Sequence, residues 1–163
     1  MWNNQEIKDP EQSLTPPRIA YTAQIPYLFS DSIEHNILQG IPKKSEIVKE
    51  SLYLAVFDAE IQKFDHGLKT VVGPKGVNLS GGQKHRVAAA RMLIRQSELI
   101  VFDDLSSALD VETEAILWER LFQTKKKTFL VVSHRPAVLQ RADQIILLKD
   151  GQVDGLGDLK ELL

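Results

Sequence analysis

The order of apolar and polar positions along the chain predicts alternating strands and helices. Short apolar runs without alternation are typical of strands covered on both faces, whereas apolar residues three and four positions apart predict amphipathic helices. This order of elements indicates an α/β fold with a mostly parallel sheet. We expect strands at 18–22, 99–102, 129–132 and 144–148, and helices at 32–38, about 45–56, 84–95, 111–122 and 136–141, with a turn of helix at 59–64 and a final helix ending at Leu163.

Three connecting segments and one helix face follow from the same pattern. Residues 1–17 are polar and rich in turn-forming residues, which predicts a connection, and glycine and proline interrupt residues 67–78 in the same way. The Asp150-Gly151 pair is a turn signal. In the 111–122 helix we expect the apolar stripe to consist of Val111, Ala115, Trp118 and Phe122.

Composition limits the classes of function. The chain has 163 residues, of which 43% are hydrophobic and 26% charged, with a net charge of −2, so it can form a core but offers no basic surface for nucleic acid. The absence of cysteine excludes disulfides and thiolate metal sites. No apolar run reaches membrane-spanning length, and no signal-peptide pattern begins the chain. We expect a soluble chain, or one attached to a membrane through a partner.

Residues 79–83 combine a helix cap with two glycines. Ser80 can accept from the first free N–H groups of the helix, and Gln83 can complete a capping box. Gly81 and Gly82 are poor helix formers, so they lower the stability of the helix unless a ligand binds to their exposed backbone. Two interpretations stay open on these residues alone: a capped helix whose glycines turn the chain, or a helix start that binds phosphate.

Acidic residues and a histidine follow two of the apolar runs. Asp103 and Asp104 end the run at 99–102, and His134 follows the run at 129–132. In open α/β sheets, ligands bind beyond the carboxyl ends of the strands. Taken singly, each residue favours a structural role: Asp104 as a cap, Asp103 facing solvent, His134 as a structural histidine. Together they match phosphoryl transfer, which needs a magnesium carboxylate and a group that orients the attacking water.

Five motifs in order then resemble the nucleotide-binding domain of ATP-binding-cassette (ABC) transporters, over essentially the whole chain. Gln24 matches the Q-loop glutamine, residues 79–83 the signature motif, residues 99–103 Walker B, and His134 the switch histidine. Residues of the D-loop are also present: Ser106, Ala108, Leu109 and Asp110. The resemblance implies a P-loop NTPase-like α/β core at 18–24 and 98–163, with an inserted α-helical subdomain at about 30–95.

The resemblance also implies a role for each residue in handling ATP and Mg²⁺. Asp103 would hold Mg²⁺ through its water shell, and Gln24 would contact the same ion or the lytic water. Asp104 stands at the position of the general base, and His134 would contact the γ-phosphate.

Other roles implied by the resemblance concern a second domain, because these domains work as head-to-tail dimers. Ser80, Gly81, Gly82 and Gln83 would contact the nucleotide held by the opposite domain. The D-loop residues would couple the two sites.

Further residues resemble the exporter branch of the family. Residues 27–31 and 36–38 fit that branch, while Val71 and Pro74 replace acidic residues of the segment that contacts the membrane region. The resemblance therefore implies an ATP-hydrolysing subunit of an exporter. Its partners would be a second nucleotide-binding domain and a transmembrane domain, at the cytoplasmic face of the plasma (inner) membrane, and no nucleic acid.

Two departures from the family pattern change this expectation. The sequence contains no Gly-x-x-x-x-Gly-Lys-Ser/Thr phosphate loop, the motif called Walker A. We therefore expect a C-terminal fragment of the domain whose N-terminal part is missing, and we expect this fragment to be inactive alone. Asp104 replaces the usual glutamate base, which favours a heterodimer with one degenerate site.

Two alternative functions stay open: a non-catalytic remnant that only lends residues 80–83 to a partner, or a soluble ABC ATPase of DNA repair or translation. The short interval from Gln24 to Leu79 disfavours the latter.

Overall fold

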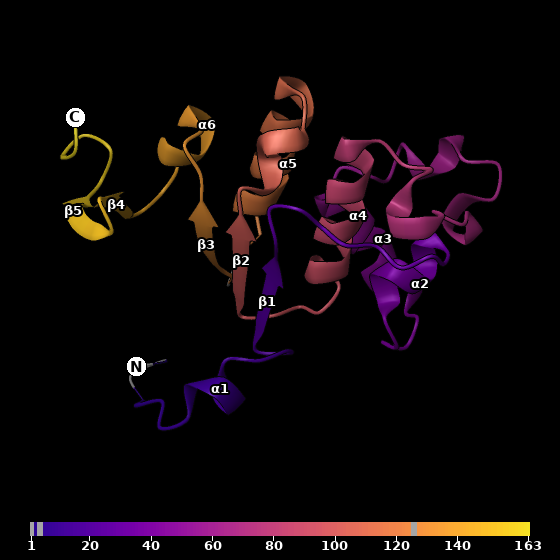
Figure 1. Ribbon diagram of the computed structural model, residues 1–163, viewed down its shortest axis with the longest axis horizontal. Coiled ribbons are helices and arrows are strands. Elements are labelled where there is room, and N and C mark those ends of the chain that lie inside the picture. The colour runs from indigo at the N-terminus through magenta and orange to yellow at the C-terminus, as the bar shows by residue number, and fades with distance from the viewer. Residues whose placement is uncertain (1, 3–4, 125–126) are drawn as a thin grey trace. The chain divides into compact units, whose positions relative to one another are not determined.

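The computed structural model describes residue 2, residues 5–124 and residues 127–163. The chain forms two compact units, residues 1–131 and 132–163. Figure 1 labels their helices and strands. The first unit contains α1 (Pro10–Ser13), β1 (Ile19–Thr22), α2 (Ile33–Leu38), α3 (Ser45–Leu54), α4 (Gly81–Leu93), β2 (Leu99–Asp103), α5 (Val111–Phe122) and β3 (Thr128–Val132, whose last residue begins the second unit), and the second contains α6 (Pro136–Leu139), β4 (Ile145–Lys149) and β5 (Gln152–Gly157).

A three-stranded sheet in the order β1-β2-β3 forms the centre of the first unit. β1 and β2 are parallel, with Ile19 opposite Leu99 and Thr22 opposite Phe102. Ile100 and Phe102 of β2 are fully buried, as expected for a strand with neighbours on both sides. The α/β fold with a parallel sheet is thus confirmed, as are the first three predicted strands.

The helix α5 packs on this sheet through an aromatic cluster. The rings of Phe102 and Trp118 meet edge to face with centroids 5.4 Å apart, and Phe122 and Phe129 extend the cluster. The predicted apolar stripe of α5 was wrong in part, because its buried face consists of Glu114, Leu117, Trp118 and Leu121. Val111 is 78% exposed because it is the first residue after the helix cap, and Ala115 faces solvent.

The helices α2, α3 and α4 pack together beside the sheet (Figure 1). Alanines 88–90 of α4 are buried, and their small side chains allow close approach of the neighbouring helices. The predicted capping box of α4 is confirmed: the N–H of Gln83 donates to Oγ of Ser80 at 3.2 Å, and the N–H of Ser80 donates to Oε1 of Gln83 at 2.7 Å. Ser32 caps α2 by accepting from the N–H of His35 at 3.0 Å, whereas α3 begins at Ser45 itself, without a side-chain cap.

The second unit differs from the prediction. β4 and β5 pair in an antiparallel hairpin, so β4 belongs to a separate two-stranded sheet, and the final helix expected before Leu163 was wrong. The reason is the turn: Asp150 and Gly151 have φ values of +49° and +78°, the conformation that a tight hairpin needs. None of the helices in the described part of the chain has the length and apolar character to span a bilayer.

Candidate nucleotide site

The parallel strands β1 and β2 end at the same edge of the sheet, and two predicted site residues lie there together. Gln24 follows β1 and donates from Nε2 to Oδ2 of Asp104, which follows β2, at 3.4 Å. Asp104 has a φ of +48°, in the left-handed region that aspartate tolerates better than most other residues. The amide of the predicted Q-loop and the carboxylate at the base position are therefore in contact.

Asp103, the last residue of β2, has a different partner. Oδ2 of Asp103 accepts a hydrogen bond from the hydroxyl of Tyr21 at 3.1 Å, and this hydrogen bond, with the charge of the carboxylate, raises the pKa of Tyr21. Asp103 itself is partly exposed. Mg²⁺ at nucleotide sites is typically held by one or two carboxylates and by substrate phosphates, so this partly exposed carboxylate fits such an ion.

The start of α4 faces solvent at Ser80 and Gly81. The hydroxyl of Ser80 accepts from the backbone of Gln83 and keeps its own O–H to donate. The side chain of Gln83 makes two hydrogen bonds within the chain: Oε1 accepts from the N–H of Ser80, and Nε2 donates to Oε1 of Glu60 at 2.7 Å. Glu60 also forms an ion pair with Arg86. The groups open to a ligand here include the Ser80 hydroxyl and the helix-start backbone.

The predicted D-loop packs against this helix start. A Cβ placed on Gly82 would lie 3.3 Å from the carbonyl oxygen of Ala108, in the short 3₁₀ helix Leu105–Ala108, and Leu109 is buried beside it. Asp110 caps α5: it accepts from the backbone N–H of Thr113 at 2.9 Å and from its hydroxyl at 2.8 Å, which lowers the pKa of Asp110. The Ser106 side chain lies outside the part that the structure describes.

His134 follows β3 within the second unit, and its side chain is exposed. Its backbone lies between the end of β3 and the start of α6. Its contact with the γ-phosphate stays a prediction.

Sequence reasoning missed three residues of this region: His85, Tyr21 and Glu60. His85 lies four residues after Gly81, so its place on the same helix face could have been predicted. Its contact with the carbonyl of Gln24, at 2.9 Å, has no signal in the sequence.

An apolar segment directly after Gln24 is held in an exposed position. Ile25, Tyr27 and Phe29 are 85%, 58% and 49% exposed. Two side chains hold the backbone of this segment. Nη1 of Arg91 donates to the carbonyl of Tyr27 at 2.8 Å, and the buried side chain of Asn36 accepts from the N–H of Phe29 and donates to its carbonyl. The segment therefore presents apolar side chains on a rigid backbone.

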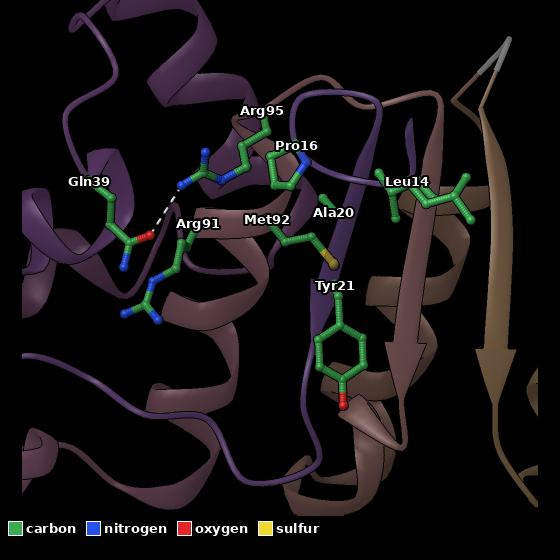
Figure 2. Close-up of a pocket in the computed structure, with 9 residues that line it drawn as sticks. Leu14, Pro16, Ala20, Tyr21, Gln39, Arg91, Met92 and Arg95 are labelled. Atoms are coloured by element: carbon green, nitrogen blue, oxygen red, sulfur yellow. Dashed lines mark hydrogen bonds between the residues drawn. The ribbon is translucent and has the colours of Figure 1, made fainter. Parts of the chain in front are cut away.

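A pocket of about 400 Å³ lies between residues 14–16, β1 and the end of α4 (Figure 2). Arg91, Met92 and Arg95 line it from α4, and Arg95 donates to Oε1 of Gln39 at 3.1 Å. None of the predicted site residues lines this pocket. Tyr21 is the link between the two: it lines the pocket and donates from its hydroxyl to Asp103.

Comparison with known proteins gives consistent matches. The family described as ABC transporter matches residues 1–107. The iron-sulfur clusters transporter atm1 of Aspergillus fumigatus is 38% identical over 165 residues, covering 99% of this chain and 23% of that protein. The ATP-dependent lipid A-core flippase of Pasteurella multocida is 37% identical over 162 residues, covering 96% of this chain and 28% of that protein.

A solved structure has the same fold. A bacterial Atm1-family ABC exporter with ATP bound superimposes with a TM-score of 0.84 at 29% identity, over 89% of this chain and 26% of that chain. The chain thus spans about a quarter of the length of these relatives. The matched residues include Gln24, the 79–83 helix start and Asp103, all inside the family match. This chain belongs to the ABC transporter family, and its relatives include exporters.

Proposed function

We propose that this chain contributes to the ATP-binding and ATP-hydrolysing part of an ABC exporter. The observation that carries the proposal is the contact between Gln24 and Asp104 beside Asp103, at one edge of a parallel sheet. An amide and two carboxylates at such an edge suit Mg²⁺-ATP and its lytic water. In this proposal Asp103 holds Mg²⁺, Gln24 contacts the ion or the water, Asp104 stands at the base position, and His134 contacts the γ-phosphate.

We further propose that the start of α4 serves a nucleotide bound to a second domain. The exposure of Ser80 and Gly81 supports this, because backbone N–H groups and a hydroxyl open to solvent can bind phosphate oxygens. In this arrangement Gly82 and Gln83 shape the helix start, and the D-loop residues, Asp110 among them, connect the two sites. We also propose subdomains at about 30–95 for the helical part and at 18–24 with 98–163 for the catalytic core.

A transmembrane domain is the second proposed partner. The exposed side chains of Ile25, Tyr27 and Phe29, on a backbone fixed by Arg91 and Asn36, give an apolar surface next to Gln24. A partner that covers this surface would act directly on a residue of the hydrolytic site. In this proposal the chain lies at the cytoplasmic face of the membrane, held there through its partner.

The chemistry of the site also limits what these residues do alone. The 163 residues contain no Gly-x-x-x-x-Gly-Lys-Ser/Thr loop, so they lack a lysine for the β- and γ-phosphates. We propose that they bind ATP weakly and hydrolyse none without another polypeptide segment that supplies such a loop. Asp104 is one methylene shorter than glutamate, and a displacement of about 1 Å can cost on the order of a hundredfold in rate. We therefore favour a heterodimer in which the partner's site does most of the hydrolysis.

The experiment that tests the proposal measures the ATPase rate of an ABC domain that carries an intact phosphate loop, with and without this chain. We expect this chain to raise the rate, and we expect Ser80→Arg to abolish the increase. Asp104→Ala is the matched variant: it leaves the α4 start intact, so it should keep the increase if the chain only lends residues 80–83. No increase with the unaltered chain would contradict the proposed partnership.

A clear thermal stabilisation of the 163-residue chain by Mg²⁺-ATP alone would contradict the proposed weak binding. We expect a shift of the melting temperature close to zero, because a ligand stabilises a protein only at concentrations near or above its dissociation constant.

A further inference from the structure

A single buried side chain connects the two parts of the proposed site. His85 lies on α4 and is 9% exposed. Its Nδ1 lies 2.9 Å from the carbonyl oxygen of Gly81, in the first turn of the same helix. Its Nε2 lies 2.9 Å from the carbonyl oxygen of Gln24, 61 residues away in the sequence. The ring therefore spans from the solvent-facing helix start to the segment after β1.

The chemistry of the ring makes the two contacts interdependent. A carbonyl oxygen only accepts hydrogen bonds, and a neutral imidazole has one N–H. A neutral ring that donates to Gln24 turns its bare nitrogen toward Gly81, and the other tautomer does the reverse. In a neutral ring, a shift of one carbonyl that favours one tautomer therefore weakens the hydrogen bond to the other carbonyl.

The connection continues to the hydrolytic carboxylate. The backbone of Gln24 contacts His85, and its side chain donates to Oδ2 of Asp104 at 3.4 Å. A path of direct contacts thus runs from Gly81 through His85 and Gln24 to Asp104. At one end lies the helix start that we assign to the partner's nucleotide, and at the other lies this chain's own base position.

We propose that His85 is a positioning residue that transmits nucleotide binding at residues 80–83 to the placement of Gln24. The inference rests on the proposed function, because it needs a nucleotide at the start of α4. It adds a residue and a direction of coupling within one chain, from the half-site that faces the partner to the half-site around Asp104.

Three variants separate this role from simple packing. His85→Phe keeps a ring in the buried position but loses both polar contacts. His85→Gln keeps an amide that can donate to the Gln24 carbonyl. Val87→Ala is the matched control, because Val87 is a fully buried residue of the same helix and forms no side-chain hydrogen bond.

The first measurement is amide hydrogen exchange in the segment 24–29 of the 163-residue chain, compared at equal global stability. Pro26 has no amide hydrogen, and the N–H of Phe29, which donates to Oδ1 of Asn36 at 2.8 Å, reports local opening of the segment. We expect His85→Phe to accelerate exchange by about fivefold, the effect of losing about one net hydrogen bond, and His85→Gln to restore most of the protection. Val87→Ala should leave these amides unchanged. Equal acceleration in His85→Phe and Val87→Ala would overturn the proposal, because packing alone would then hold Gln24.

The second measurement adds Mg²⁺-ATP and a purified ABC domain with an intact phosphate loop. In the unaltered chain we expect slower exchange at residues 80–83 and at residues 24–29. In His85→Phe only the first segment should respond. A response at both segments in His85→Phe would overturn the transmission by His85 while leaving the proposed function standing. A response at neither segment in the unaltered chain would overturn the proposed function, and with it the transmission, while the first measurement still decides whether His85 holds Gln24.

Discussion

The backbone of Gly82 lies against the carbonyl of Ala108 so closely that a Cβ at position 82 would stand 3.3 Å from that oxygen. At Gly81, the neighbouring glycine, the nearest atom to such a Cβ is Cβ of Ala108 at 4.0 Å, which is ordinary contact. The two adjacent glycines thus differ in the space that each leaves for a side chain. The helix start and the predicted D-loop meet at Gly82, whereas Gly81 has room for a Cβ.

This difference predicts that two matched substitutions differ in their effect on stability. Gly81→Ala should be neutral or stabilise the chain by up to about 1 kcal/mol, because alanine is the better helix former. Gly82→Ala should be less stable than Gly81→Ala by about 1 kcal/mol, because the added methyl crowds the Ala108 carbonyl. Urea unfolding of both variants measures the difference. Equal free energies of unfolding would contradict the close contact.

The buried amide of Asn36 carries a second prediction. It accepts from Arg91 at 2.9 Å and from the N–H of Phe29, and it donates to the carbonyls of Phe29 and Ser32. Asn36→Ala should destabilise the chain by about 2–4 kcal/mol, because these buried partners lose their hydrogen bonds together. Ser51→Ala is the control: Ser51 is also buried but forms one side-chain hydrogen bond, to the carbonyl of Val48, so the loss should be about 1 kcal/mol. A loss for Asn36→Ala no larger than for the control would show that the network contributes little.

The helix cap at Asp110 predicts that the chain loses stability at acidic pH. The hydrogen bonds from Thr113 lower the pKa of Asp110 in the folded chain. Its contribution to stability is therefore complete above its pKa in the unfolded chain, about 3.9, and is lost as the pH falls through its lower folded value. Asp110→Asn keeps a capping oxygen without the charge, so thermal unfolding of this variant should depend less on pH in that acidic range. An unchanged pH dependence would mean that other carboxylates account for the acid sensitivity.

The hydrogen bond from Tyr21 to Asp103 predicts a loss of stability as the pH rises, the opposite of the dependence expected for Asp110. Its pKa is raised by the hydrogen bond to Asp103, so its contribution to stability is complete below its unfolded pKa of about 10 and is lost as the pH rises through the folded value. Tyrosinate absorbance should show one phenol that titrates late, and Tyr21→Phe should remove that phase. Asp103→Asn should move the phase to lower pH, because the acceptor charge is gone. A late phase that survives in Tyr21→Phe would assign it to another tyrosine.

Local patterns predicted the first unit well because its elements depend on short-range chemistry. The capping box of Ser80 and Gln83, the cap at Ser32 and the apolar run of β2 are each encoded within a few residues. The last helix was wrong because the hairpin turn at Asp150-Gly151 redirects the chain into a second strand, and the expected stripe of α5 was rotated because its true face is set by the sheet below it.

In the candidate site, too, some features could be predicted from the sequence and others could not. Its residue types and their order indicated the family from the sequence alone. The contacts that organise the site, from Tyr21 to Asp103 and from His85 to Gln24, join residues 82 and 61 positions apart. Only the parallel pairing of β1 with β2 and the packing of α4 beside them bring those residues together.

The commitment of the Gln83 side chain to Ser80 and Glu60 has a consequence for nucleotide choice. These two hydrogen bonds hold one N–H and one lone pair of the amide within the chain, so this surface offers a ligand mainly the Ser80 hydroxyl and main-chain N–H groups. Such groups respond to negative charge and not to the identity of the base. Under the proposed function, we expect any preference for ATP over GTP to be set mainly by the domain that holds the nucleotide, while the start of α4 responds to the phosphates.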